Sequence, residues 1–169
     1  VTIPNTITSI GGQAFNESHL SGVIFEENSQ LTTIGDSAFW GNPLVSVTLP
    51  NSVTSIGNMA FAACSTLTDI TLSNNLQSIG DLAFAGCKAL TDLTIPASVT
   101  SIGANVFSAC PALKTLTFED IYGWYDIDGN GFAVSTIPSS NVFAISENMA
   151  LVKVDDGTSE WESMLTLTG

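Results

Sequence analysis

A short motif recurs five times along the chain. It is an Ile-Gly pair, then three variable residues, then Phe. It begins at Ile10, Ile34, Ile56, Ile79 and Ile102, with steps of 24, 22, 23 and 23 residues. A regular period of this length is typical of repeat proteins, in which each unit contacts mainly its neighbours. A unit of about 23 residues is too small to bury its own apolar side chains, so the sequence predicts a stack of units around one continuous core.

Each repeat carries the pattern of a short strand followed by other short elements. In the repeat spanning 67–90, polar and apolar residues alternate over 69–73, which is typical of a half-buried strand. A second short extended segment is expected over 76–79. Residues 81–85 are of helix-compatible types, so the sequence predicts one or two helical turns there. These turns would carry Phe84 towards the core.

Stacking places equivalent residues of successive repeats above one another at the strand spacing of about 4.8 Å, so every repeated position becomes a column. Burial of each Phe or Ile side chain stabilises the fold by roughly 1.5 to 3 kcal/mol. The two predicted inner columns contain Phe15, Phe39, Phe61, Phe84 and Phe107 in one, and Ile10, Ile34, Ile56, Ile79 and Ile102 in the other.

Cysteine forms a third column, because Cys64, Cys87 and Cys110 lie 23 residues apart. No Cys-x-x-Cys spacing is present and His19 is the only histidine, which disfavours zinc. Parallel Cβ vectors are also poor geometry for a disulfide. The sequence therefore predicts buried free thiols. The first two repeats lack the cysteine, and Asn16 and Asn42 are expected to take its polar role.

The consensus Leu-Thr-x-Ile-x-x-Pro-x-x-Val-Thr-Ser-Ile-Gly-x-x-Ala-Phe-x-x-Cys-x-x-Leu resembles the BspA-like subclass of bacterial leucine-rich repeats, over residues 1–118. The resemblance implies an α/β repeat fold: a right-handed solenoid of about five repeats, with a parallel sheet on its concave face and short helical or extended segments on its convex side. Residues 1–4 match the strand residues 93–96, so the chain starts inside a strand. We therefore expect it to be an N-terminally truncated piece of a longer protein.

The period fails after Phe118, and residues 119–169 hold nine of the 16 acidic residues and one lysine. The sequence predicts a C-terminal cap for the solenoid here, the alternative being a small independent module. Segments 142–145 and 150–154 are expected to be strands or core segments. About 50 residues are marginal for independent folding, which favours the cap.

Within that region, Asp126, Asp128 and Asn130 match the first ligands of an EF-hand calcium loop, with glycine in the sixth position. The twelfth position holds Ile137, where a bidentate Glu belongs. The favoured interpretation is an acidic, glycine-rich surface turn. No cofactor is therefore expected, and a calcium site is the alternative.

Charge and residue types exclude several functions. The net charge is −13, with three lysines and no arginine, so the chain lacks the cationic cluster that nucleic acids or anionic membranes require. The longest uninterrupted apolar run, 59–64, is far shorter than the ~20 residues of a membrane-spanning helix. A single histidine leaves few candidates for a catalytic base, so no enzyme is expected.

The predicted concave face carries the candidate binding residues. Threonine occupies one outward column of the strands, beside a second column that contains two aspartates. High β propensity alone explains threonines on an exposed sheet. The alternative is a flat, mildly acidic platform for a partner, and its candidate ligand-binding residues are Asp69, Thr71, Asp92, Thr94 and Thr117.

These observations predict a non-enzymatic protein-binding module that favours basic partners. The family resemblance implies a secreted or surface-displayed bacterial protein that adheres to host or neighbouring-cell proteins, and therefore an extracellular or cell-surface location. One alternative is a structural spacer within a larger surface protein. Another is calcium or carbohydrate recognition through the C-terminal module, where Trp124 and Tyr125 could stack on a sugar.

Overall fold

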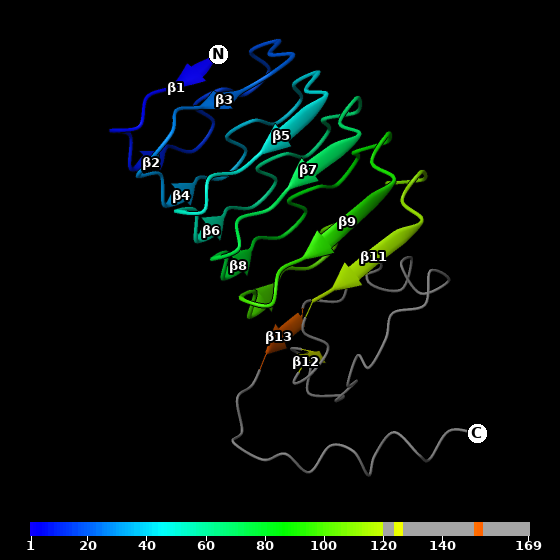
Figure 1. Cartoon of the computed structure of the whole chain (residues 1–169). Coiled ribbons are helices and arrows are strands. Elements are labelled where there is room, and N and C mark those ends of the chain that lie inside the picture. Colours follow the sequence, from blue (N-terminus) through cyan, green and yellow to red (C-terminus); the bar gives the residue numbers. More distant parts are fainter. Residues whose placement is uncertain (120–123, 127–150, 154–169) are drawn as a thin grey trace, which may run out of the picture.

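The computed structural model describes residues 1–119, 124–126 and 151–153. The described chain winds into a stack of coils, a parallel β-solenoid of about five turns (Figure 1). Each coil contributes one strand to each of two sides of the stack. The first side, here called the front face, consists of β1 (Thr2–Ile3), β3 (Ile24–Phe25), β5 (Ser46–Thr48), β7 (Asp69–Thr71), β9 (Asp92–Ile95) and β11 (Thr115–Phe118).

The second side, here called the back sheet, is built from one Ser-Ile or Thr-Ile dipeptide per coil. Its strands pair in parallel from β2 to β10, each isoleucine lying beside that of the next coil. All five isoleucines are at most 5% exposed, so the predicted Ile column is confirmed. The strands are β2 (Ser9–Ile10), β4 (Thr33–Ile34), β6 (Ser55–Ile56), β8 (Ser78–Ile79) and β10 (Ser101–Ile102).

A third side is here called the turn edge. It comprises residues 11–18, which are partly exposed, and residues 35–42, 57–64, 80–87 and 103–110. Its Phe rings stack coil upon coil, with centroids 5.3 to 6.0 Å apart and ring planes within 11° of parallel. The predicted Phe column is therefore confirmed. Phe15, in the first coil, is only partly buried.

The helical turns predicted over 81–85 are wrong. These residues form turns, and the described part of the chain contains no helix. Leu82 adopts a φ of 56°, in the left-handed region that an α-helix excludes. Its N–H instead donates to the carbonyl of Ala104 in the next coil, at 2.9 Å. Hydrogen bonding between coils therefore overrides the local helix propensity.

Glycine at the start of the turn edge permits close approach between coils. A Cβ placed on Gly80 would lie 2.6 Å from the backbone nitrogen of Asn58 and 2.6 Å from the carbonyl carbon of Gly57. Real Cβ atoms essentially never come so close to other atoms. The repeated glycine is therefore a packing requirement, which explains its place in the motif.

Two strands from the C-terminal region extend the back sheet. β13 (Leu151–Lys153) pairs antiparallel with β10, and β12 (Trp124–Asp126) pairs antiparallel with β13. The strand expected within 150–154 is confirmed, whereas segment 142–145 lies outside the described residues. That the whole of 119–169 forms a cap stays a prediction.

Candidate functional site

The front face follows the predicted alternation of side chains. In β7, Ile70 points inward and is 5% exposed, while Asp69 and Thr71 are exposed. β5, β9 and β11 repeat this pattern. The exposed threonine column runs through Thr48, Thr71, Thr94 and Thr117, and Ile24 replaces threonine in β3.

The front face is not one continuous sheet. Its strands pair as β1 with β3, β5 with β7, and β9 with β11, and no ladder joins β3 to β5 or β7 to β9 among the described strands. A hollow lies at each break, of about 590 Å³ between β3 and β5 and about 200 Å³ between β7 and β9. The breaks therefore shape the front face into two recesses, a feature that was not predicted from the sequence.

The sequence differs between the two breaks. The chain takes seven residues from Ile24 to Leu31 but only five from Thr48 to Val53, so the second coil carries a longer loop beside β3. At the second break, continuous pairing would place Asp69 directly opposite Asp92, and like charges at such positions are destabilising.

The smaller hollow brings together four of the five predicted binding residues, because Asp69, Thr71, Asp92 and Thr94 all line it. The fifth, Thr117, lies outside the lining, on β11 opposite Thr94. Glu119, which was not among the predicted residues, also lines this hollow. Its Oε2 accepts a hydrogen bond from the N–H of Ala97 at 3.1 Å.

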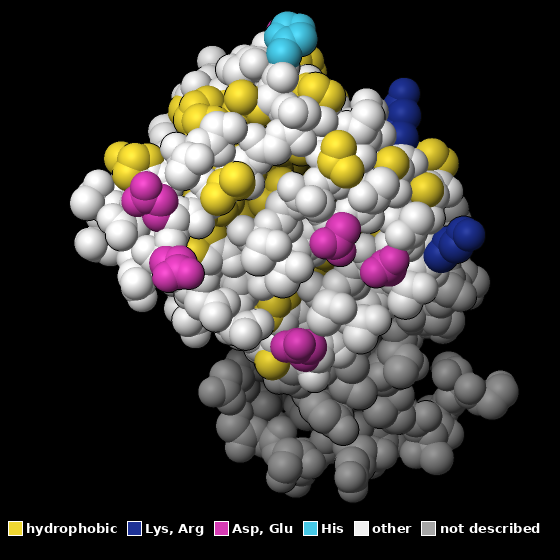
Figure 2. All heavy atoms as spheres, turned by 45° about the horizontal axis from the view of Figure 1, so that its top comes forward, with side chains coloured by type: hydrophobic (Ala, Val, Ile, Leu, Met, Phe, Trp, Pro, Cys, Tyr) yellow, Lys and Arg dark blue, Asp and Glu magenta, His cyan; other side chains and the backbone are white. Residues whose placement is uncertain are grey.

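Three carboxylates thus line the smaller hollow, and the described residues that line it include neither a lysine nor a histidine. In Figure 2, acidic side chains are scattered over the face shown, whereas the lysines lie near its edge. The recess therefore attracts cationic groups and repels anionic ones.

The cysteines offer no chemistry to a ligand. Cys64, Cys87 and Cys110 are buried and free, which confirms the prediction. Each thiol donates to the carbonyl of a Phe in the previous coil, at 3.1 to 3.3 Å. Burial raises the pKa of the Cys64 thiol from 9.0 to about 11, and it also raises the pKa of Cys87. These thiols therefore stay protonated at neutral pH and are poor nucleophiles.

Asn42 takes the place of cysteine in the second coil, as predicted. It is 1% exposed, and its Nδ2 donates to the carbonyls of Phe15 and Phe39 at 2.6 and 2.9 Å. Asn16 does not play this part. It follows Phe15 directly instead of by three residues, and its buried Oδ1 accepts no hydrogen bond.

The calcium prediction remains open. Asp126 is the last residue of β12, whereas Asp128 and Asn130 lie outside the described residues. Within the described ranges no group of three or more His, Cys, Asp or Glu side chains is placed to hold a metal. The described part of the chain also contains no helix long and apolar enough to cross a membrane.

Comparison with solved structures identifies similar solenoids in bacterial proteins. The pneumococcal vaccine antigen PcpA is 35% identical, with a TM-score of 0.70, over 76% of this chain and 32% of its own. A leucine-rich repeat protein of T. pallidum (TpLRR) is 31% identical, with a TM-score of 0.66, over 69% and 56%. A leucine-rich cell surface protein from Faecalibacterium prausnitzii A2-165 is 34% identical, with a TM-score of 0.55, over 76% and 41%.

This chain therefore spans about a third of the PcpA chain, just over half of TpLRR and about two fifths of the F. prausnitzii protein. The comparison with curated proteins found no match. The family described as the BspA type leucine-rich repeat region matches residues 1–114 in six copies, one more than the five repeats expected from the Ile-Gly motif. The chain belongs to the BspA-type leucine-rich repeat family.

Proposed function

We propose that this chain is a non-enzymatic protein-binding module of a secreted or cell-surface protein, and that its front face contacts the partner. The observation that carries the proposal is the smaller hollow, where three carboxylates line a recess whose described lining residues include no lysine or histidine. Such a site suits a basic segment of a protein, because complementary charge speeds encounter and selects partners.

The similar proteins support a surface location. One is a vaccine antigen and another is described as a cell surface protein. An adhesive role, in which the partner belongs to a host or neighbouring cell, is the form of binding that we propose. The exposed Thr71 and Thr94 side chains of the hollow supply hydrogen-bonding groups next to the carboxylates.

The test begins with a screen of the purified chain against extracellular matrix proteins, blood proteins and glycans, with and without calcium. A protein that binds saturably is then measured against the double variant Asp69→Asn with Asp92→Asn. We expect affinity to fall by about tenfold, since each exposed charge pair contributes up to about 1 kcal/mol.

A matched control adds two positive charges elsewhere. Gln77→Lys with Thr100→Lys changes the net charge by the same amount beside the back sheet, where both residues are exposed. This control should leave affinity within about twofold. An equal loss in both double variants would show that only overall charge matters, and unchanged affinity in the aspartate variant would remove the hollow from the proposal.

A spacer role is the second candidate, because this chain spans only about a third of PcpA, just over half of TpLRR and about two fifths of the F. prausnitzii protein. A spacer would bind nothing in the screen in either calcium condition. Binding that appears only with calcium, and that Asp126→Asn removes, would instead favour recognition through the C-terminal region.

A further inference from the structure

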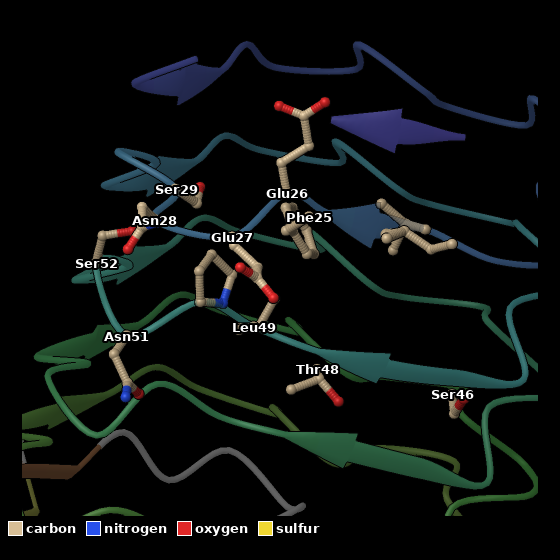
Figure 3. A pocket seen from close by; sticks show the side chains of 13 residues that line it. Phe25, Glu26, Glu27, Asn28, Ser29, Ser46, Thr48, Leu49, Asn51 and Ser52 are labelled. Carbon is tan, nitrogen blue, oxygen red and sulfur yellow. The ribbon is translucent and has the colours of Figure 1, made fainter. Parts of the chain in front are cut away.

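The larger hollow, between β3 and β5, offers a second and chemically distinct recess. It is an open recess with a volume of about 590 Å³, which lies within the range of about 300 to 1,000 Å³ typical of ligand sites. The longer loop after β3 contributes Glu26, Glu27 and Asn28 to its lining (Figure 3). The described residues that line it include no lysine or histidine, so none of them neutralises the carboxylates.

Apolar side chains line part of this recess. Ile24 is 66% exposed, which is unusual for isoleucine, and it stands where β5, β7, β9 and β11 present threonine. Phe25 beside it is only partly buried, while Leu49 is 3% exposed. Phe25 packs against the core, so the recess offers the uncovered part of its ring and the exposed aliphatic carbon of Ile24 to the stem of a ligand side chain.

The two glutamates of the loop differ in orientation. Figure 3 shows the Glu26 carboxylate pointing away from the recess and the Glu27 carboxylate pointing towards Leu49. Glu26 Oε2 already accepts the N–H of Asn5, at 3.0 Å. Among the described residues, the Glu27 carboxylate has neither a hydrogen bond nor an ion pair. Glu27 is thus the carboxylate available to a ligand.

Main-chain polar groups also face the break. The N–H of Ile24 donates to Val1 beside β1 at 2.9 Å, so the backbone of the next residue, Phe25, faces the opposite side, towards β5. In β5, the N–H of Leu49 donates to Thr71, so the backbone of Thr48 faces β3. No ladder joins these two edges, which leaves both N–H donors and carbonyl acceptors of Phe25 and Thr48 at the break.

The width of the break decides what can enter it. Cα atoms of β3 and β5 approach within 8 Å. A strand inserted between them would need about 9.6 Å, twice the usual spacing. An added strand is therefore excluded, and a single long side chain with several donors is the ligand whose chemistry matches the carbonyl acceptors, the carboxylate and the ring. Guanidinium has this chemistry: it pairs with carboxylates and stacks on aromatic faces.

We propose that the hollow between β3 and β5 binds an arginine side chain of a protein partner, with Glu27 as its counter-ion and Phe25 against its guanidinium or stem. The inference rests on the proposed protein-binding role of the front face, but it concerns a recess separate from the one between β7 and β9. It identifies the partner as a segment that presents arginine.

The test uses a short peptide with blocked ends and one central arginine, titrated into the ¹⁵N-labelled full chain and followed by NMR. We expect saturable shifts in the amide signals of Ile24, Phe25 and Thr48. Glu27→Gln should weaken binding by about threefold to tenfold, as expected for a charged hydrogen-bonded pair. The matched control Glu26→Gln changes the net charge equally and should have little effect.

Two further peptides isolate the chemistry. Citrulline in place of arginine keeps the shape but removes the charge and should abolish saturable shifts, whereas lysine should bind more weakly than arginine. The proposal fails if the arginine peptide produces no saturable shifts at β3 and β5, if citrulline binds as well, or if the two glutamine variants weaken binding equally.

The same titration separates this proposal from the proposed function. The double variant Asp69→Asn with Asp92→Asn should leave the arginine-peptide shifts at β3 and β5 intact, even where it abolishes binding of a whole partner. Loss of those shifts in the double variant would show that the two hollows are not separate sites, and it would overturn the assignment of arginine to β3 and β5.

Discussion

The turn edge and the front face are built from the same repeat but differ in how continuously their hydrogen bonds join successive coils. At the turn edge the hydrogen bonds from coil to coil continue through every break of the front face, for example from Phe39 to Ala60 and from Phe84 to Val106, at 2.8 and 3.0 Å. The front face, by contrast, pairs its strands two by two. The comparison indicates that the turn edge and the back sheet set the spacing of the coils. The front face can therefore accommodate a longer loop after β3 and the neighbouring aspartates of β7 and β9.

The largest test of this comparison removes one ring from the Phe column. Phe84→Ala should lower the free energy of unfolding by about 3 to 5 kcal/mol, because the ring is fully buried and stacks on two neighbours. Urea titration followed by circular dichroism measures the change. Phe25→Ala, which removes a partly buried ring from the front face, is the control and should cost less than half as much. A loss below about 1 kcal/mol for Phe84→Ala would contradict the assignment of coil spacing to the turn edge.

A glycine exchange tests the close approach between coils. Gly80→Ala places a methyl group against the backbone of Asn58 and should destabilise the protein by about 1 to 3 kcal/mol, because backbone atoms cannot easily move aside. Thermal unfolding measures the effect. Gly11 holds the same place in the first repeat, but a methyl group there would meet no atom within 4 Å, so Gly11→Ala should change stability by less than about 0.5 kcal/mol. Equal effects at both glycines would mean that contact between coils is not what restricts the position.

The columns could be predicted from sequence because stacking follows from the period alone. Phe84 and Cys87 point inward whatever the conformation of the intervening residues, so an incorrect helix over 81–85 did no harm to the predicted core. The helix itself was wrong because Leu82 satisfies its N–H in the neighbouring coil rather than in its own turn. Local propensity carries no information about that partner.

Part of the candidate site could also be predicted from the repeat period and from the alternation of side chains within a strand. Alternation within a strand placed Asp69 and Asp92 on the outer surface, and the period placed them in adjacent coils. The breaks depend on pairing between strands, which a single repeat does not encode. The step of 24 residues, with its longer loop, was the available signal for the larger hollow. Glu119 was missed because it was grouped with the C-terminal region, although it occupies the position that Glu26 holds in an earlier coil.

The smallest expected effect concerns the left-handed residues of the turn edge. Ala63 has a φ of 57°, and glycine stands at the equivalent places in the flanking coils, Gly41 with a φ of 70° and Gly86 with a φ of 74°. The left-handed conformation costs a non-glycine residue about 1 to 2 kcal/mol, and glycine relieves this cost. Glycine also makes the unfolded chain more flexible, which offsets about 0.5 to 1 kcal/mol of the relief. Ala63→Gly should therefore raise stability by about 0.5 kcal/mol, measured as a higher urea midpoint.

The neighbouring Ala62 supplies the control for that exchange, since its φ is not positive and its side chain is 5% exposed. Ala62→Gly should lower the urea midpoint, because it increases the entropy of the unfolded chain and removes a buried methyl group without relieving strain. Opposite signs at adjacent alanines would show that the hydrogen bonds between coils hold Ala63 in its unfavourable conformation. A fall in stability for both variants would mean that the left-handed geometry of the turn edge carries no strain, and that its regularity comes from side-chain packing alone.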